Sequence, residues 1–280
     1  MRRSTLVVAA GAALVLTLSA CGAKGGTAAP APAGGDAGNN QPALASPFTD
    51  AIQLASASKQ GTEKTKSAKF TMEAGAGGQT VKASGAISME GGNVKLAMTM
   101  DTGQGQQMEM RFVDNAMYMK MPPEQLKQMG TTKPWMKISA DGDDPISKSF
   151  GSVMAKASKE SDPTHALEQI SKTGKIISAD QTTLDGMPVN HYKVELDVAK
   201  SLEEFGGSGV DLGKLKGKDI KLPMELWLDK NQLPLQVVVD SGPLLKAVGA
   251  PGGTADAKTT MKYTDWGTTV DVAAPPADQT

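Results

Sequence analysis

Apolar and polar residues alternate along most of the chain. The clearest stretch is LAMTMDTGQGQQMEMRFVDNAMYMKM, from Leu96 to Met121, where an apolar side chain, usually methionine, stands at nearly every second position of three short segments. A period of two is typical of a strand with one buried face. The glycines of DTGQGQ and the pair Asp114-Asn115 are residues that hairpin loops favour. The pattern predicts three antiparallel neighbours that share one apolar face.

The same alternation continues on both sides of this stretch. It is found in SAKFTMEA and in residues 81–89, 135–138, 176–182, 189–198, 220–228, 233–239 and 259–263. Turn residues separate these segments, for example Leu184-Asp185-Gly186 and Asp229-Lys230-Asn231. We therefore expect an α+β protein with one large antiparallel sheet, twisted and curled.

Helical segments are fewer and shorter than the strands. The patterns predict helices within residues 48–66, with Thr49 or Asp50 as the N-cap, and over residues 122–129, 147–158, 163–171 and 199–205. Pro163 stands at an early helical position, where its missing N–H costs nothing. We expect these helices to cover the apolar face of the sheet.

The first 21 residues have the pattern of a bacterial lipoprotein signal peptide. Arg2 and Arg3 precede an apolar run from Leu6 to Leu18, which is shorter than the roughly 20 residues of a spanning helix. Leu18-Ser19-Ala20-Cys21 resembles the lipobox, and Cys21 is the one cysteine of the chain. Cleavage before Cys21 and its acylation would make it the mature N-terminus and tether the protein to the outer face of the cell membrane.

Composition divides the rest of the chain into a linker and one domain. Residues 22–47 are rich in Gly, Ala and Pro and have almost no large apolar residue, so they are expected to form a flexible linker. Residues 48–276 form the predicted domain. Without Arg2 and Arg3 the chain has 27 basic and 30 acidic residues, a balance that does not indicate a nucleic-acid partner.

No motif of the sequence indicates catalysis. The chain has neither a G-x-S-x-G elbow nor an H-E-x-x-H motif, and its two histidines, His165 and His191, are 26 positions apart. We therefore expect neither an enzyme nor a cofactor.

The alternating methionines have three explanations. They could fill irregular gaps in a core, since the thioether side chain is unbranched and flexible. They could line a cavity for alkyl chains, for the same reason. Thirdly, Met-x-Met on one strand face places soft sulfur ligands side by side, which suits Cu(I). The residues expected to line a cavity are Met98, Met100, Met108, Met110, Phe112, Met117, Met119, Leu222, Met224, Leu226, Val237 and Val239.

The order of these features resembles a known family. The lipobox, the linker, the early helix, the many-stranded meander, PMELWLDKNQLPLQVVV and the late KYTDWGTTVDVAAPP are similar to actinobacterial lipoproteins of the LppX and LprG type. The resemblance implies a fold like that of LolA-type carriers, a half-barrel with helices on its concave side. It also implies a lipid or glycolipid ligand held between sheet and helices, with an envelope transporter as a partner.

The leading hypothesis is a membrane-anchored lipoprotein that binds acyl chains in an apolar cavity and carries or presents them in the cell envelope. Residues 141–162 and 205–219 are candidates for a gate, because they are polar segments with glycines. The alternative is an interaction or signalling lipoprotein with a closed core and another envelope protein as its partner. A Cu(I)-binding protein is a third hypothesis.

Overall fold

The computed structural model describes residues 44–76, 78–90, 93–101, 107–139, 142, 163–205, 215, 218–249 and 257–280. Contacts divide the chain into residues 1–41 and 42–280, and every described residue lies in the second unit. The predicted signal peptide with Cys21, most of the linker, the helix expected at 147–158 and most of both gate segments therefore lie outside the described residues.

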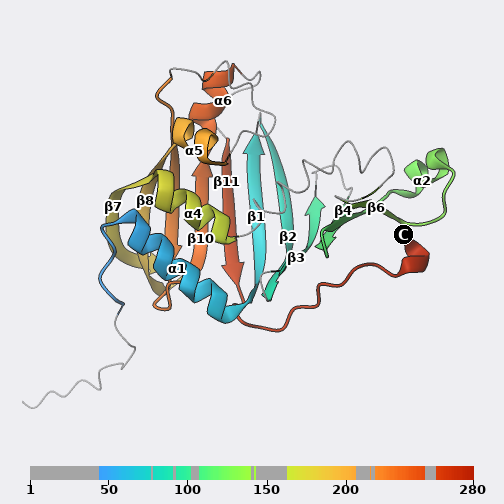
Figure 1. Cartoon of the computed structure of the whole chain (residues 1–280), viewed down its shortest axis with the longest axis horizontal. Helices are drawn as coiled ribbons and strands as arrows, with labels where there is room; N and C mark the ends of the chain where they lie inside the picture. Colours follow the sequence, from blue (N-terminus) through green and yellow to red (C-terminus); the bar gives the residue numbers. More distant parts are fainter. Residues whose placement is uncertain are drawn as a thin grey trace, which may run out of the picture. The chain divides into compact units, whose positions relative to one another are not determined.

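The described residues form one antiparallel sheet of eleven strands, as the alternation predicted (Figure 1). The strand order is β6-β5-β4-β3-β2-β1-β11-β10-β9-β8-β7, so β6 and β7 are its two edges and the sheet is not closed. The strands are β1 Ser67–Ala76, β2 Gln79–Glu90, β3 Asn93–Asp101, β4 Gln107–Val113, β5 Ala116–Lys120, β6 Trp135–Ser139, β7 Gly174–Leu184, β8 Met187–Asp197, β9 Lys221–Leu228, β10 Pro234–Asp240 and β11 Lys258–Thr264.

Two of the predicted turns are two-residue hairpins. Asp114 and Asn115 both have positive φ, at 51° and 59°, as do Asp185 and Gly186, at 50° and 81°. Positive φ at both central residues defines the type I′ turn, whose twist matches that of paired strands. The β9–β10 turn is held differently, because the carboxylate of Asp229 accepts the backbone N–H groups of Asn231 and Leu233, both at 2.8 Å.

Four of the five predicted helices lie within the described residues. They are α1 Ala51–Thr65, α2 Pro123–Met129, α4 Pro163–Thr173 and α5 Val198–Phe205. Asp50 is the N-cap of α1, and its carboxylate accepts the N–H groups of Ile52 and Gln53 at 2.9 and 3.0 Å. The short helices α6 Gly242–Val248 and η2 Ala277–Gln279 were not predicted.

The two faces of the sheet are covered by different parts of the chain. We call the face beneath α1 and α4 the helix face, and the opposite one the tail face. On the helix face, Leu54 of α1 and Leu167 and Ile170 of α4 pack on β8 and β9 in one buried cluster. On the tail face, Val270 and Val272 of the C-terminal segment pack against Val113, Tyr118 and Trp135.

The helices cover only one part of the helix face. Figure 1 shows α1 and α4 over the strands from β7 to β10, and α2 beyond the ends of β5 and β6. The expectation that residues 122–129 would lie over the apolar face was therefore wrong. Pro122 and Pro123 start α2 as a separate turn after β5.

Gly85 lies where β2 and β3 come unusually close together. It pairs with Phe70 on one side and Met98 on the other, both on the helix face. A Cβ at Gly85 would lie 2.2 Å from the carbonyl oxygen of Ala97 and 2.9 Å from the Cα of Met98. Glycine in a strand marks such close backbone approaches and bends. The crowding is on the helix-face side of the two strands.

We expect Gly85→Ala to lower the free energy of unfolding by about 1–3 kcal/mol, because the new methyl group overpacks the backbone of β3. Urea denaturation of the variant measures this change. Ser84→Ala, at the next, exposed position on the other face, is the control and should change stability by less than about 0.5 kcal/mol. Equal stability of the two variants would contradict the close approach.

Candidate functional site

The helix face has no charged side chain across the six strands from β1 to β6. Residues that pair directly across strands lie on the same face, and the register therefore gives its members. They are Ala68, Phe70, Met72, Ala74, Ala76, Gln79, Val81, Ala83, Gly85, Ile87, Met89, Val94, Leu96, Met98, Met100, Met108, Met110, Phe112, Met117, Met119, Met136 and Ile138. From β3 to β6 all of these except Ile138 are only half-buried.

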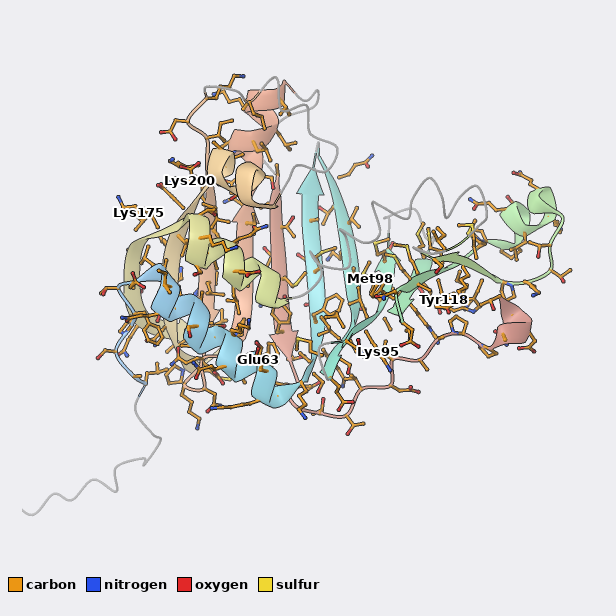
Figure 2. The ribbon with its side chains drawn as sticks, in the orientation of Figure 1. Glu63, Lys95, Met98, Tyr118, Lys175 and Lys200 are labelled. Carbon is orange, nitrogen blue, oxygen red and sulfur yellow. The ribbon has the colours of Figure 1, made fainter. Side chains whose placement is uncertain are left out.

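Seven of the predicted cavity residues lie on this half-buried part of the face. Met98 pairs with Met110, and Met110 pairs with Met119. Beside this row, Met100 pairs with Met108, and Phe112 pairs with Met117. Figure 2 shows yellow sulfur atoms gathered near the labelled Met98. The structure thus brings together side chains from β3, β4 and β5, as the shared period predicted.

The other five predicted residues lie on the helix face beneath α1 and α4. Met224 and Leu226 of β9 are buried in the cluster with Leu54 and Ile170. Leu222, Val237 and Val239 are partly buried and pack against the same cluster. These five residues share the face of the methionine group but lie in its helix-covered part.

The sequence analysis missed Met136 of β6, which pairs with Met119 and extends the methionine row to a fourth strand. It also missed Met261 of β11, which pairs with both Met72 and Val237 and joins the two parts of the face. Both methionines stand in segments whose alternation was recognised. Their place beside the other methionines depends on which strands pair, and only the register shows this.

Tyr263 shows how apolar this face is between its two parts. It pairs with Phe70, and its ring lies 5.5 Å from that of Trp266. Burial raises the pKa of the Tyr263 hydroxyl to about 12. Tyr192, under the helices, also has a raised pKa because of its burial, and its hydroxyl accepts the backbone N–H of Phe48 at 3.1 Å.

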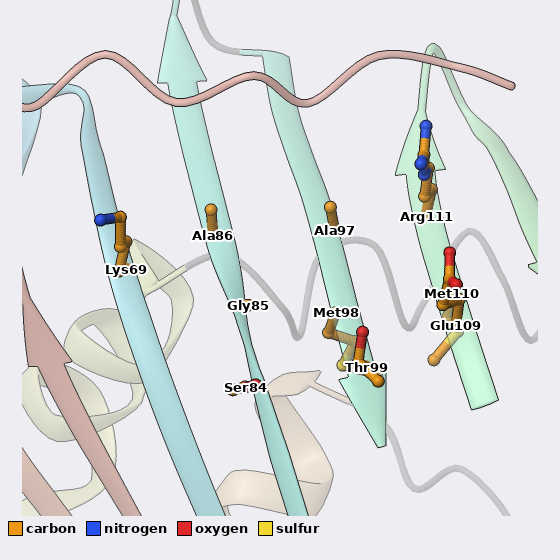
Figure 3. A pocket seen from close by; sticks show the side chains of 10 residues that line it. All are labelled: Lys69, Ser84, Gly85, Ala86, Ala97, Met98, Thr99, Glu109, Met110 and Arg111. Atoms are coloured by element: carbon orange, nitrogen blue, oxygen red, sulfur yellow. The ribbon is translucent and has the colours of Figure 1, made fainter. Parts of the chain in front are cut away.

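The tail face has a shallow hollow of ≈ 300 Å³ over β1 to β4 (Figure 3). Small side chains form its floor and charged ones its margin, and each of these charges has a partner in the chain. Lys69 pairs with Asp265 at 3.0 Å, and Glu109 pairs with Lys120 at 2.6 Å. Arg111 donates to the carbonyl of Ala273 and lies over the ring of Trp135. The hollow therefore offers no unpaired charge to a ligand.

The described part of the chain has neither of two other classes of site. No group of three or more His, Cys, Asp and Glu side chains is arranged there to hold a metal ion. None of the helices described is both long and apolar enough to cross a membrane. The uncharged helix face is thus the feature with the clearest chemistry.

Comparisons with known proteins give one relative by sequence and several solved structures. No family model matches the chain. An uncharacterised 31.2 kDa protein from the rplA-rplJ intergenic region of Streptomyces griseus is 24% identical over 235 residues, covering 80% of this chain and 73% of that protein. The crystal structure of the lipoprotein LppX of Mycobacterium tuberculosis has a TM-score of 0.48 at 10% identity, and covers 80% of this chain and 98% of that one. LprF from Mycobacterium bovis has a TM-score of 0.45 at 16% identity, covering 82% and 99%.

LppX is of the lipoprotein type that the sequence resembles. The fold class itself, a large curled and unclosed antiparallel sheet with short helices, is established by the strand order and register of this chain.

An apolar dye tests whether the half-buried part of the helix face is accessible. We expect the delipidated chain to enhance the fluorescence of anilinonaphthalene sulfonate, because the dye binds exposed apolar surface. Met110→Glu should lower this fluorescence, since it places a charge in the middle of the face. Lys137→Glu, on the tail face of β6, is the control. An equal signal from both variants would place the dye elsewhere.

Proposed function

We propose that the protein is a membrane-tethered lipoprotein that binds acyl chains of a lipid or glycolipid on its helix face and carries or presents them in the cell envelope. The observation that supports this most is the uncharged, half-buried face of β3 to β6, which adjoins the buried cluster under α1 and α4. Contiguous apolar surface of this kind is typical of interaction sites.

The chemistry of the face suits alkyl chains better than polar ligands. The paired positions from β1 to β6 offer no charge and no hydroxyl group on the helix face, and their one amide side chain is that of Gln79 at the start of β2. A ligand over β3 to β6 must therefore be apolar along its length. Each methylene taken out of water contributes about 0.8 kcal/mol, and a long acyl chain can therefore be held firmly without directional contacts. Flexible methionines would allow the same surface to fit chains of different shape.

The tether and the domain boundaries are part of the same proposal. Residues 1–21 would be the signal peptide, Cys21 the acylated N-terminus, residues 22–47 the linker and 48–276 the lipid-binding domain. The described end of that linker is fixed to the sheet, because Asn190 and Gln181 both donate to the carbonyl of Ala45 at 3.1 Å. An anchored domain of this kind would work at the outer face of the membrane, as a carrier and not as an enzyme.

Native mass spectrometry of the full chain tests whether the protein holds a lipid. The Cys21→Ser variant, purified from its own host, lacks the acylation site, so any lipid that remains is bound without a covalent bond. We expect a discrete added mass that organic extraction releases as a lipid. A clean apo mass that stays unchanged after incubation with a host lipid extract would contradict the carrier and favour the closed-core interaction protein.

A tryptophan on the helix face tests the place of binding. We expect Met110→Trp to lower acyl-chain affinity about tenfold or more, because displacing two methylenes costs about 1.6 kcal/mol. A fluorescent fatty acid titrated into each variant measures the change. Lys137→Trp adds the same bulk to the tail face and should bind as the parent does. Unchanged affinity in a stable Met110→Trp variant would rule out this part of the face.

A further inference from the structure

Methionine is concentrated on one part of the helix face. From β3 to β6 the face has eleven paired positions, of which seven are methionine: Met98, Met100, Met108, Met110, Met117, Met119 and Met136. Under α1 and α4, the nine residues of β8 to β10 in the core cluster include only Met224. Leucine, valine and Tyr192 fill the other eight positions, where helices cover the sheet. Gap filling alone therefore does not explain why methionine gathers on β3 to β6.

Four of these methionines form a straight row across four adjacent strands. Met98 of β3 is opposite Met110 of β4, which is opposite Met119 of β5, which is opposite Met136 of β6. Direct cross-strand neighbours have Cβ atoms about 4.5–5.5 Å apart. Two rotatable bonds of the methionine side chain, χ1 and χ2, set the position of its sulfur atom. The sulfur atoms of three successive members reach one ion when the two outer side chains lean toward the middle one.

Few kinds of ion would bind where several thioether sulfurs meet. Thioether sulfur is neutral and soft, and it selects Cu(I) over the hard cations, which need carboxylate or carbonyl oxygens. The helix face supplies no charge here, so a monovalent ion is favoured over a divalent one, whose desolvation would cost far more. The described residues offer no competing cluster of His, Cys, Asp and Glu side chains.

We propose that Met98, Met110, Met119 and Met136 form a thioether site for a soft monovalent cation, with Cu(I) as the ion and Ag(I) as its redox-stable analogue. Any three adjacent members complete a trigonal sulfur site. The site lies on the face proposed for acyl chains, but it does not depend on that function, because it requires sulfur and an acyl chain requires only apolar surface.

Anaerobic titration of the full chain with Cu(I), in competition with bicinchoninate, tests the site. All variants carry Cys21→Ser, which removes the one thiol of the chain. We expect the parent to bind one ion per chain. The double variant Met110→Leu/Met119→Leu leaves no three adjacent methionines in the row, so its affinity for Cu(I) should be lower by about tenfold or more. Met187→Leu, at an exposed methionine of the β7–β8 hairpin, should bind as the parent does. X-ray absorption of the bound ion should show sulfur neighbours only.

The proposal is overturned if the parent takes up no ion in competition, or if the double leucine variant binds as tightly as the parent. Circular dichroism and thermal unfolding check that the variant is folded, which leucine favours because it conserves apolar volume. Acyl loading measured on the same variants separates the two functions. The double leucine variant should keep its lipid and lose the metal, whereas a chain that binds metal but never lipid would contradict only the lipid proposal.

Discussion

The close approach of β2 and β3 at Gly85 is the constraint on which the rest of the sheet depends. No side chain larger than hydrogen fits between Gly85 and the backbone of Ala97 and Met98. Glycine at such a position marks a bend in a curled sheet, and the crowding is on the side on which α1 and α4 lie. A flat sheet of eleven strands would instead leave this apolar surface open to water on a plane, where edge-to-edge and face-to-face aggregation begin.

The two parts of the sheet are stabilised from opposite sides. The strands β7 to β10 are covered on the helix face, where Tyr192, Leu226 and Leu228 are fully buried. The strands β4 to β6 have most of their buried residues on the tail face, in the cluster of Val113, Ala116, Tyr118, Trp135 and Val272, whereas Ile138 is buried on the helix face. Because the C-terminal segment supplies this second core, the methionine side of β3 to β6 is not needed as the main core of that part. Its methionines are accordingly only half-buried.

Strands and tight turns, which depend on residues close together in the sequence, could be predicted. The pairing of distant strands could not. Alternation and the type I′ turns at Asp114-Asn115 and Asp185-Gly186 are local signals, and the strands they predict are present. The pairing of β1 with β11 joins residues almost 200 positions apart, and no local pattern indicates it. Only the strand register shows that Met136 belongs to the row and that position 85 requires glycine, because both depend on which strands pair. The helix α6 was missed because Gly242 and Pro243 are typical of loops as well as of a helix start.

The first described residues of the chain are held at the edge of the sheet opposite the methionine row. The carbonyl of Ala45 is held by Asn190 of β8 and Gln181 of β7, at one edge of the strand order. The methionine row begins at β3 and ends at β6, the opposite edge. With about 4.8 Å between neighbouring strands, six strand intervals separate β8 from β3. The described residues before α1 therefore pack on the helix-covered strands and leave the methionine row, at the other edge of the strand order, uncovered.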